Sequence, residues 1–360
     1  MTLIRRRVAQ VVCVGLAAVG LLLPLPATLV ERWYSTGVYP LLQRVVTPVT
    51  NLLPLAVFDL LLVTVVIWTL VVLGQGSRLA LRSRRVGPAT GALWRLVVAG
   101  AVVYLVFLAL WGLNYRRVPL ADRLEVAAGA PAPGVVVALG YEVASQLNAL
   151  HAEAHGTGWP ATPWQTAPLR EGFAEVQILL GARRPAVPGR LKPTLLGPYF
   201  RWTGVDGMVN PFALETLESP GLLPFERPFV AAHEWAHLAG YADEAEASFV
   251  GWLTCLRGGV PAAYSGWLAL FTQVLAEVGR ERETELADAL ENGPRSDIAA
   301  IANRQRSAQV PALRLVGWSI YDRFLRANRV EEGIRRYGAF VTLVTQARFD
   351  DGWTPVQRID

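Results

Sequence analysis

Charged residues, cysteine and lysine are all scarce in this sequence of 360 residues. Only 18% of the residues are charged, against about 25% in soluble globular proteins, so a purely soluble cytosolic protein is not expected. The two cysteines, Cys13 and Cys255, lie far apart and Cys13 stands inside an apolar run, which argues against a structural disulfide. Lys192 is the only lysine among 34 basic residues, and this preference for arginine reflects genome composition rather than a function.

Apolar residues, by contrast, are abundant. They make up 52% of the chain and the mean hydropathy is +0.32, which excludes a disordered protein because such a chain can bury a large core. The net charge is +5, but the basic residues form short clusters at the ends of apolar runs instead of one continuous stripe. We therefore expect no nucleic-acid partner.

Three long apolar runs in the first third of the chain predict transmembrane helices, at residues 8–30, 53–74 and 96–113. Each has close to the ~20 residues that cross a bilayer core of ~30 Å. Pro24 and Pro26 stand where a cleavable signal peptide would need small residues, so the first run is interpreted as a span. Asp59, near the outer end of the second run, is interpreted as an interfacial carboxylate. The sequence thus predicts a membrane section over residues 1–117, with the lipid bilayer as its partner.

The distribution of arginine predicts how the spans are oriented. Basic clusters precede the first run, at Arg5–Arg7, and fill the loop between the second and third runs, where four arginines lie between residues 78 and 85. The positive-inside rule then places the N-terminus and this second loop in the cytoplasm. With three spans, residues 118–360 form an extracytoplasmic domain of a multi-pass protein of the cell (inner) membrane.

The outer domain alternates helix-like runs with breaks rich in proline and glycine, which predicts a mainly α domain with a small β element. We expect a helix over 135–154, an irregular stretch over 159–198, and an edge strand in GVDGMVNPF at 204–212. Further helices are expected at about 228–239, 243–257, 262–289, 296–308, 310–328 and 330–348.

Residues 233–237 read HEWAH, an HExxH pattern. On a helix, His233 and His237 are one turn apart on the same face, so their imidazoles can converge on one metal ion. Glu234 points to the side of that face, where it can reach a metal-bound water without being a ligand. The pattern predicts one Zn2+ with two histidine ligands and a glutamate general base, in a zincin-like domain. The alternative is a pair of buried, hydrogen-bonded histidines.

A zinc site needs a third protein ligand, and the segment GYADEAEASF that follows offers three carboxylates. Glu244 is ranked first because it heads an E-x-x-A spacing that resembles the ligand helix of gluzincin proteases. Ser248 stands where those proteins commonly have a supporting Asp. Glu246 is ranked second. Asp243 is third, with the ligand spacing of metzincins; Asp243 and Glu246 also fit the N-cap and third position of a capping box.

The remaining two histidines, His151 and His155, form a second pair one turn apart in HAEAH. With Glu153 nearby they offer a second metal site, but the preferred interpretation is that both lie in the last turns of a helix, where histidine interacts favourably with the helix dipole. A hydroxyl that stabilises an oxyanion would come from a tyrosine, and Tyr337, in RYGAF, is preferred over Tyr199 and Tyr264.

The chain also resembles a bacterial family of uncharacterised membrane proteins, a domain-of-unknown-function family with three N-terminal spans and an outer domain that carries HExxH and then G-x-x-x-E-x-E-A. The stretches that carry the resemblance are ERWYSTGVYP (31–40), WGLNYRRVPL (111–120), GVDGMVNPF (204–212), LPFERPFVAAHEWAH (223–237) and YDRFLRANRVEEGIRRYGAFVTLV (321–344). The resemblance implies a gluzincin-like zinc metallopeptidase and implies no substrate. NPF at 210–212 departs from the aromatic-rich YxPF of the family, which leaves the substrate role of that strand open.

The motif and the resemblance together predict a membrane-anchored zinc metallopeptidase. One Zn2+ would be held by His233, His237 and Glu244, with Glu234 as the base, and the substrate would be an unknown peptide or related amide outside the cytoplasm. The rival hypothesis is a non-catalytic sensor or scaffold that retains the zinc-site fold. The presence of Glu234 together with both histidines favours catalysis.

Overall fold

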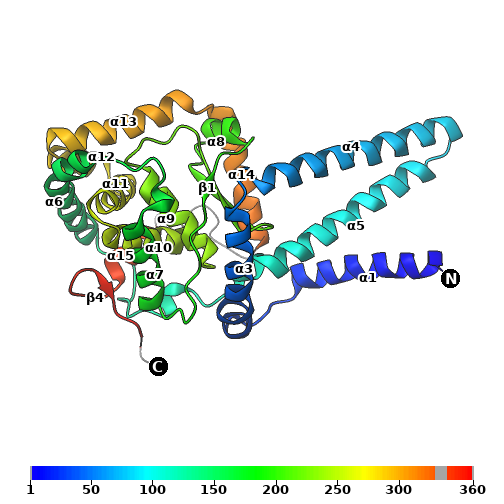
Figure 1. Ribbon diagram of the computed structural model, residues 1–360, viewed down its shortest axis with the longest axis horizontal. Helices are drawn as coiled ribbons and strands as arrows, with labels where there is room; N and C mark the ends of the chain where they lie inside the picture. Colours follow the sequence, from blue (N-terminus) through cyan, green and yellow to red (C-terminus); the bar gives the residue numbers. More distant parts are fainter. Residues whose placement is uncertain (1, 329–338, 359–360) are drawn as a thin grey trace.

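The computed structural model describes residues 2–328 and 339–358, and these are mostly helical with a small sheet. Long apolar helices project from one side of a helical domain (Figure 1): α1 (Thr2–Leu22), α4 (Val57–Ser83) and α5 (Gly87–Leu110). Helix α5 packs against both α1 and α4. Large apolar side chains on the projecting helices are exposed, as lipid-facing side chains would be; Leu60 is 62% exposed and Leu70 is 64% exposed.

Two of these helices, α4 and α5, are long and apolar enough to cross a membrane, and they overlap the predicted spans at 53–74 and 96–113. The first span differs from the prediction of 8–30, because α1 ends at Leu22, just before Pro24 and Pro26 interrupt the helix. The chain resumes as α2 (Ala27–Leu29), a π-helix (Val30–Val38) and α3 (Tyr39–Asn51), bent by 111° from α1. The described residues therefore hold two candidate spans, or three if this bent pair counts as one.

The N-terminus and the turn between α4 and α5 lie at the same far end of the projecting helices, away from the helical domain (Figure 1). The turn is only residues 84–86, since α4 continues to Ser83. The two arginine clusters that the positive-inside rule assigns to the cytoplasm are thus on one side, and the helical domain is on the other.

A reporter that is active only outside the cytoplasm should be active when fused after Asp360 and silent when fused after Arg85. The reason is that the arginines around the α4–α5 turn oppose its translocation. Reporter activity in intact cells, normalised to the amount of each fusion, is the measurement. The opposite pattern would place the helical domain in the cytoplasm and overturn the predicted orientation.

The helical domain is built around α10 (Glu244–Arg257), most of which is buried. Helices from several parts of the chain pack on α10, namely α7 (Ala167–Leu179), α9 (Arg227–Leu238), α11 (Val260–Glu277) and α15 (Ala339–Gln346). The outer helices are α6 (Pro133–Thr157), α8 (Gly197–Thr203), α12 (Arg280–Asp288), α13 (Asn292–Ala308) and α14 (Pro311–Ala327). Single 3-10 turns occupy Gly112–Arg116, Leu120–Asp122 and Pro163–Gln165.

Two predictions for the helical domain need correction. The helix predicted over 262–289 is two helices, α11 and α12, because Val278 and Gly279 both adopt extended backbone. The stretch predicted as irregular, 159–198, contains α7, whose Leu169, Phe173 and Val176 are buried at helical spacing. Of the helix predicted over 330–348, residues 330–338 lie outside the described residues.

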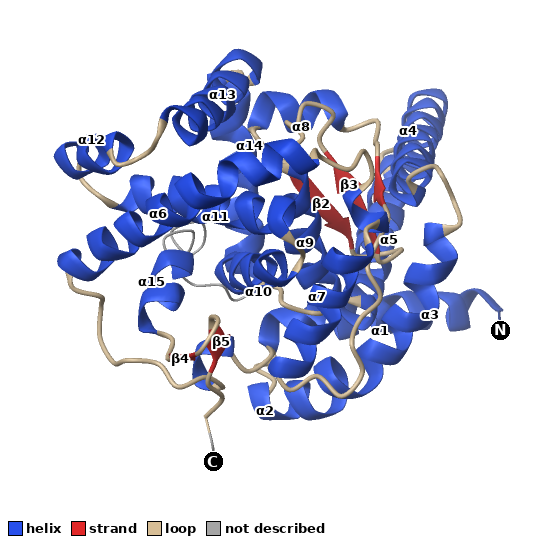
Figure 2. Cartoon of the chain, turned by 60° about the vertical axis from the view of Figure 1, so that its left-hand side comes forward, coloured by secondary structure: helices blue, strands red, loops and turns tan. Residues whose placement is uncertain are grey.

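A three-stranded sheet lies beside α9 (Figure 2). Its order is β1 (Leu191–Lys192), β3 (Glu215–Glu218) and β2 (Gly207–Asn210), with β1 parallel and β2 antiparallel to β3. The prediction of an edge strand within 204–212 is therefore confirmed by β2. A second antiparallel pair, β4 (Phe349–Asp350) and β5 (Thr354–Pro355), lies near the C-terminus.

The only lysine of the chain is fully buried and fixes the sheet to the membrane section. Lys192 Nζ donates hydrogen bonds to Glu215 Oε2 and to the Thr50 carbonyl, both at 2.7 Å. The Glu215 carboxylate also accepts from the backbone N–H groups of Val57 (3.1 Å) and Phe58 (2.7 Å), which begin α4. Because the first N–H groups of a helix have no partner within it, Glu215 caps this candidate span.

An amine-reactive ester should label the folded, detergent-solubilised protein at its N-terminal amine and leave Lys192 unmodified. Lys192 is 0% exposed and its ammonium is held by Glu215, so the reagent can reach it only after unfolding. Peptide mass spectrometry before and after denaturation measures both sites in one sample. Equal labelling of Lys192 and the N-terminus in the folded protein would contradict this burial.

Candidate metal centre

Helix α9 carries HEWAH in its last turns, and the chain then reverses sharply. The N–H of Gly240 donates to the His237 carbonyl (3.0 Å) and the N–H of Tyr241 donates to the Ala236 carbonyl (3.1 Å), the bond pair of a Schellman motif. Gly240 has φ +86°, a left-handed conformation that glycine adopts at no steric cost. This turn brings α10 back beside the histidines.

The start of α10 is fixed by its cap. Asp243 Oδ1 accepts hydrogen bonds from the N–H groups of Ala245 (3.1 Å) and Glu246 (3.2 Å), so the predicted N-cap is confirmed. Glu244 is consequently the first residue of α10. It is placed on the first turn, directly facing the histidines of α9.

The structure brings His233, His237 and Glu244 together. Glu244 Oε2 lies 3.3 Å from His233 Nε2 and 3.6 Å from His237 Nε2, and all three candidate ligand atoms lie within 4.8 Å of one another. Ligand atoms of tetrahedral zinc, with bonds of about 2.0–2.1 Å, are separated by about 3.3 Å. The spacing therefore fits zinc, and two histidines with one glutamate leave a fourth position for water or substrate.

Both histidine rings are oriented by contacts at their other nitrogen. His237 Nδ1 lies 2.7 Å from the Tyr241 carbonyl, which can only accept, so Nδ1 carries the hydrogen and Nε2 is left as a ligand. His233 Nδ1 lies 3.2 Å from the Ser248 hydroxyl. Ser248, on α10, thus contacts the ring of a candidate ligand on α9.

The carboxylate of Glu244 has a partner that the sequence does not predict by spacing. The hydroxyl of Tyr321, on α14, donates a hydrogen bond to Glu244 Oε1. The available signal was that Tyr321 opens the family-like stretch at 321–344. Tyr337, the predicted oxyanion donor, lies outside the described residues. Of the other two tyrosines considered, Tyr199 is 41% exposed on α8, and Tyr264 bonds to Asp297 instead.

Glu234 is almost fully buried beside the histidines, and its Oε2 has no hydrogen-bond partner among the described residues. Its other oxygen faces β2, where a Cβ on Gly207 would come within 2.5 Å of Glu234 Oε1. Burial raises the pKa of Glu234 to about 8. A buried carboxylate oxygen without a donor is costly, so this side chain suits a site that supplies a polar hydrogen, such as that of a metal-bound water.

The charges of the three candidate ligands are coupled. Although burial opposes it, His237 and His233 hold the pKa of Glu244 well below its usual range, so this carboxylate is ionised. Burial alone would lower the pKa of His237, but the Glu244 carboxylate raises the pKa of this ring to about 9. The pKa of His233 is lowered, because there the effect of burial is the larger one. A metal cation would take the place of the His237 proton, which is how metal binding releases protons.

Of the three carboxylates in the segment after the histidines, only Glu244 reaches them. Glu246 Oε1 instead accepts from the backbone N–H of Leu120, at 2.5 Å, so it does not complete a capping box with Asp243. Burial, and then the charge of Asp243, raise the pKa of Glu246 to about 7. Asp243 is occupied as the N-cap.

Residues of the membrane section hold the C-terminal end of α9. Trp111 Nε1 donates to the His237 carbonyl (2.9 Å), the Tyr39 hydroxyl donates to the Leu238 carbonyl (2.7 Å), and Arg117 donates to the Gly240 carbonyl (3.0 Å). These bonds satisfy carbonyls that a helix end leaves unpaired. The candidate metal centre thus lies where the helical domain meets the membrane section.

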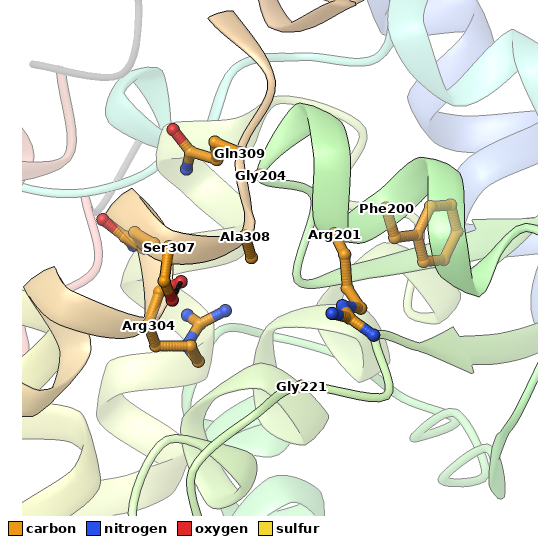
Figure 3. Close-up of a pocket in the computed structure, with 9 residues that line it drawn as sticks. Phe200, Arg201, Gly204, Gly221, Arg304, Ser307, Ala308 and Gln309 are labelled. Carbon is orange, nitrogen blue, oxygen red and sulfur yellow. Dashed lines mark hydrogen bonds between the residues drawn. The ribbon is translucent and has the colours of Figure 1, made fainter.

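A pocket lined by residues of α8 and α13 is separate from these candidate ligands (Figure 3). The side chains of Arg201 and Arg304 stand on opposite sides of it (Figure 3). Arg304 bonds to Asp206, just before β2, at 3.0 Å and to Glu226 at 2.6 Å. Two carboxylates therefore neutralise the charge of Arg304. These bonds connect α13 to the segments just before β2 and just before α9.

The second histidine pair also meets a carboxylate. His151 and His155 lie on α6 and face Asp297 of α13, while Glu153 is exposed and outside this group. Asp297 is far from HAEAH in the sequence, so the spacing within HAEAH does not predict this contact.

A protein-family model described as "Protein of unknown function (DUF3810)" matches residues 34–345. The match extends from the π-helix before α3 to α15, and it includes the three candidate ligands and Glu234. No curated protein and no solved structure matches the chain.

Proposed function

The chain belongs to the DUF3810 family of proteins of unknown function, and from the geometry of its own site we propose that it is a membrane-anchored zinc metallopeptidase. The observation that carries the proposal is the convergence of His233, His237 and Glu244 next to the buried carboxylate of Glu234. Two histidines and a glutamate are a ligand set of catalytic zinc, and a glutamate that follows the first histidine is the usual base.

Zinc bound to these ligands would lower the pKa of a coordinated water to about 7 and polarise the carbonyl of the scissile amide. The charge of the bound cation would favour the ionised form of Glu234, which would accept a proton from the attacking water and deliver it to the leaving nitrogen as the C–N bond breaks. The products are a carboxylic acid and an amine. Tyr321, which already bonds to Glu244, would hold that ligand in place.

The edge strand supports a peptide as the substrate class. Among the described residues β2 pairs with β3 alone, and Gly207 of β2 lies against Glu234. An extended peptide can add to a free strand edge through main-chain hydrogen bonds. A peptide added to β2 would run past the proposed base, which supports hydrolysis of a peptide or a related amide outside the cytoplasm.

The rival hypothesis, a non-catalytic sensor or scaffold, gives Glu234 no role. A buried carboxylate with a raised pKa and an unpartnered oxygen lowers the stability of the fold. A purely structural zinc site does not need such a carboxylate beside its ligands. Ionisable side chains with a strongly shifted pKa are concentrated at functional sites. The catalytic proposal explains the residue and the scaffold hypothesis does not.

The proposal is tested on the full chain in detergent, by zinc analysis and peptide-library digestion. A chelator should abolish cleavage and added zinc should restore it in the same sample. His233→Ala should hold about one zinc fewer than the wild type and should not cleave, because a site left with two ligands binds zinc weakly. Unchanged zinc content in His233→Ala, or cleavage that persists after chelation, would refute the proposal.

A further inference from the structure

A second group of metal-binding side chains lies away from the HEWAH helix. His155 Nε2 lies 2.8 Å from Asp297 Oδ2, and His151 Nε2 lies 3.7 Å from the same oxygen. The three candidate ligand atoms lie within 4.8 Å of one another, as they do in the group of His233, His237 and Glu244. The two imidazoles come from consecutive turns of α6 and the carboxylate comes from α13, so two packed helices hold the arrangement.

The spacing suits a metal ion. Ligand atoms around a tetrahedral zinc are about 3.3 Å apart, and the two nitrogen–oxygen distances lie on either side of this value. Both Nε2 atoms face one carboxylate oxygen. A favourable interaction of histidine with the end of α6 requires no carboxylate from another helix, so it does not account for Asp297.

The charge of Asp297 is compensated by nothing else in the described chain. No arginine or lysine among the described residues forms an ion pair with it. Arg295, two residues earlier, donates instead to the carbonyls of Asp288 and Leu290. A buried carboxylate that faces two imidazoles and pairs with no arginine or lysine of the described residues offers a cation three ligand atoms.

Tyr264, on α11, orients the carboxylate. Its hydroxyl donates a hydrogen bond to Asp297 Oδ2 at 2.6 Å. Carboxylate ligands of metals are commonly held by such a hydrogen bond. Trp159 and Phe225 pack around His155, whose side chain is 37% exposed, which leaves one side of the group accessible to an ion.

We propose that His151, His155 and Asp297 form a second metal site, for a divalent transition ion such as Zn2+, that ties α6 to α13. Two imidazoles and one carboxylate suit zinc and its neighbours, whereas magnesium and calcium prefer oxygen ligands alone. The site is structural in this proposal. It is independent of the peptidase proposal, because it shares no residue with that site.

The test uses the full chain carrying His233→Ala and His237→Ala, so that the HEWAH site contributes no zinc. This background should retain about one zinc after equilibration with a zinc buffer, because its second set of three ligands is intact. Adding His155→Ala should remove that zinc. Glu153→Gln is the matched control, since it changes an exposed charge between the two histidines and leaves the ligands in place.

Tyr264→Phe gives a second readout that does not depend on removing a ligand. It deletes only the hydroxyl that bonds to Asp297, and loss of such a supporting bond weakens metal affinity by about 10–100-fold. Affinity is measured by competition with a chromophoric chelator, and the absorption of bound Co2+ checks that nitrogen and oxygen are the ligands. Circular dichroism confirms that each variant is folded.

A background protein that binds no zinc would overturn the proposal, as would a zinc content that His155→Ala leaves unchanged. An affinity unaltered by Tyr264→Phe would show that Asp297 is not a ligand and overturn it equally. The peptidase proposal fails by different results, namely a zinc content that His233→Ala leaves unchanged from the wild type, or cleavage that survives chelation.

Discussion

Glu234→Gln is expected to retain zinc and to slow peptide hydrolysis by about 10²–10⁴-fold, the contribution of a general base. This corresponds to about 2.7–5.4 kcal/mol of transition-state stabilisation. Glutamine has the same shape and keeps the contact with Gly207, but it cannot accept the proton of the attacking water. Because the native side chain is buried with a raised pKa, replacing it by a neutral group should not destabilise the fold.

Glu226→Gln is the matched control for this prediction. Glu226 is also a partly buried carboxylate with a pKa raised by burial, and it lies at the start of the same helix, bonded to Arg304. Its loss should affect stability and leave the turnover number unchanged. Peptide digestion and zinc analysis are run on all three proteins. Cleavage that survives unchanged in Glu234→Gln would indicate a contaminating protease and revive the scaffold hypothesis.

The parts of the site that lie within one helix were predictable from the sequence. His233, Glu234 and His237 follow from helical periodicity, because residues one turn apart share a face whatever the rest of the fold. The cap at Asp243 is equally local, since an Asp before a helical run accepts from the N–H groups two and three positions on. From the cap, the start of α10 is fixed at Glu244.

What the sequence did not reveal depends on contacts between distant segments. Tyr321 reaches Glu244 across 77 positions, and Glu246 turns to Leu120 across 126, which no spacing rule contains. The same holds for Asp297 and the second histidine pair. Helix α7 is different, because its apolar spacing was present in the sequence but was hidden by the prolines on either side of it.

Glu244→Gln, which tests the proposed third ligand, is expected to lower zinc affinity by more than about 100-fold. A ligand contributes more than the supporting groups whose loss costs 10–100-fold, and glutamine removes the charge that faces both histidines. The measurement is competition with a chromophoric chelator, in a His155→Ala background so that the proposed second site does not contribute. Tyr321 would also lose its ionised acceptor, which adds to the effect.

Glu246→Gln is the internal comparison, and it should keep its zinc. The native carboxylate accepts one backbone hydrogen bond from Leu120, which a glutamine oxygen can also accept, and burial and the charge of Asp243 raise its pKa to about 7. Since burial already favours the neutral form of the native group, the neutral variant should change the free energy of unfolding by no more than about 1 kcal/mol, the size of one hydrogen bond. Zinc retained in Glu244→Gln and lost in Glu246→Gln would mean that α10 is rotated in the working protein. The histidines and the base would stand in that case, and Glu246 would replace Glu244 as the ligand.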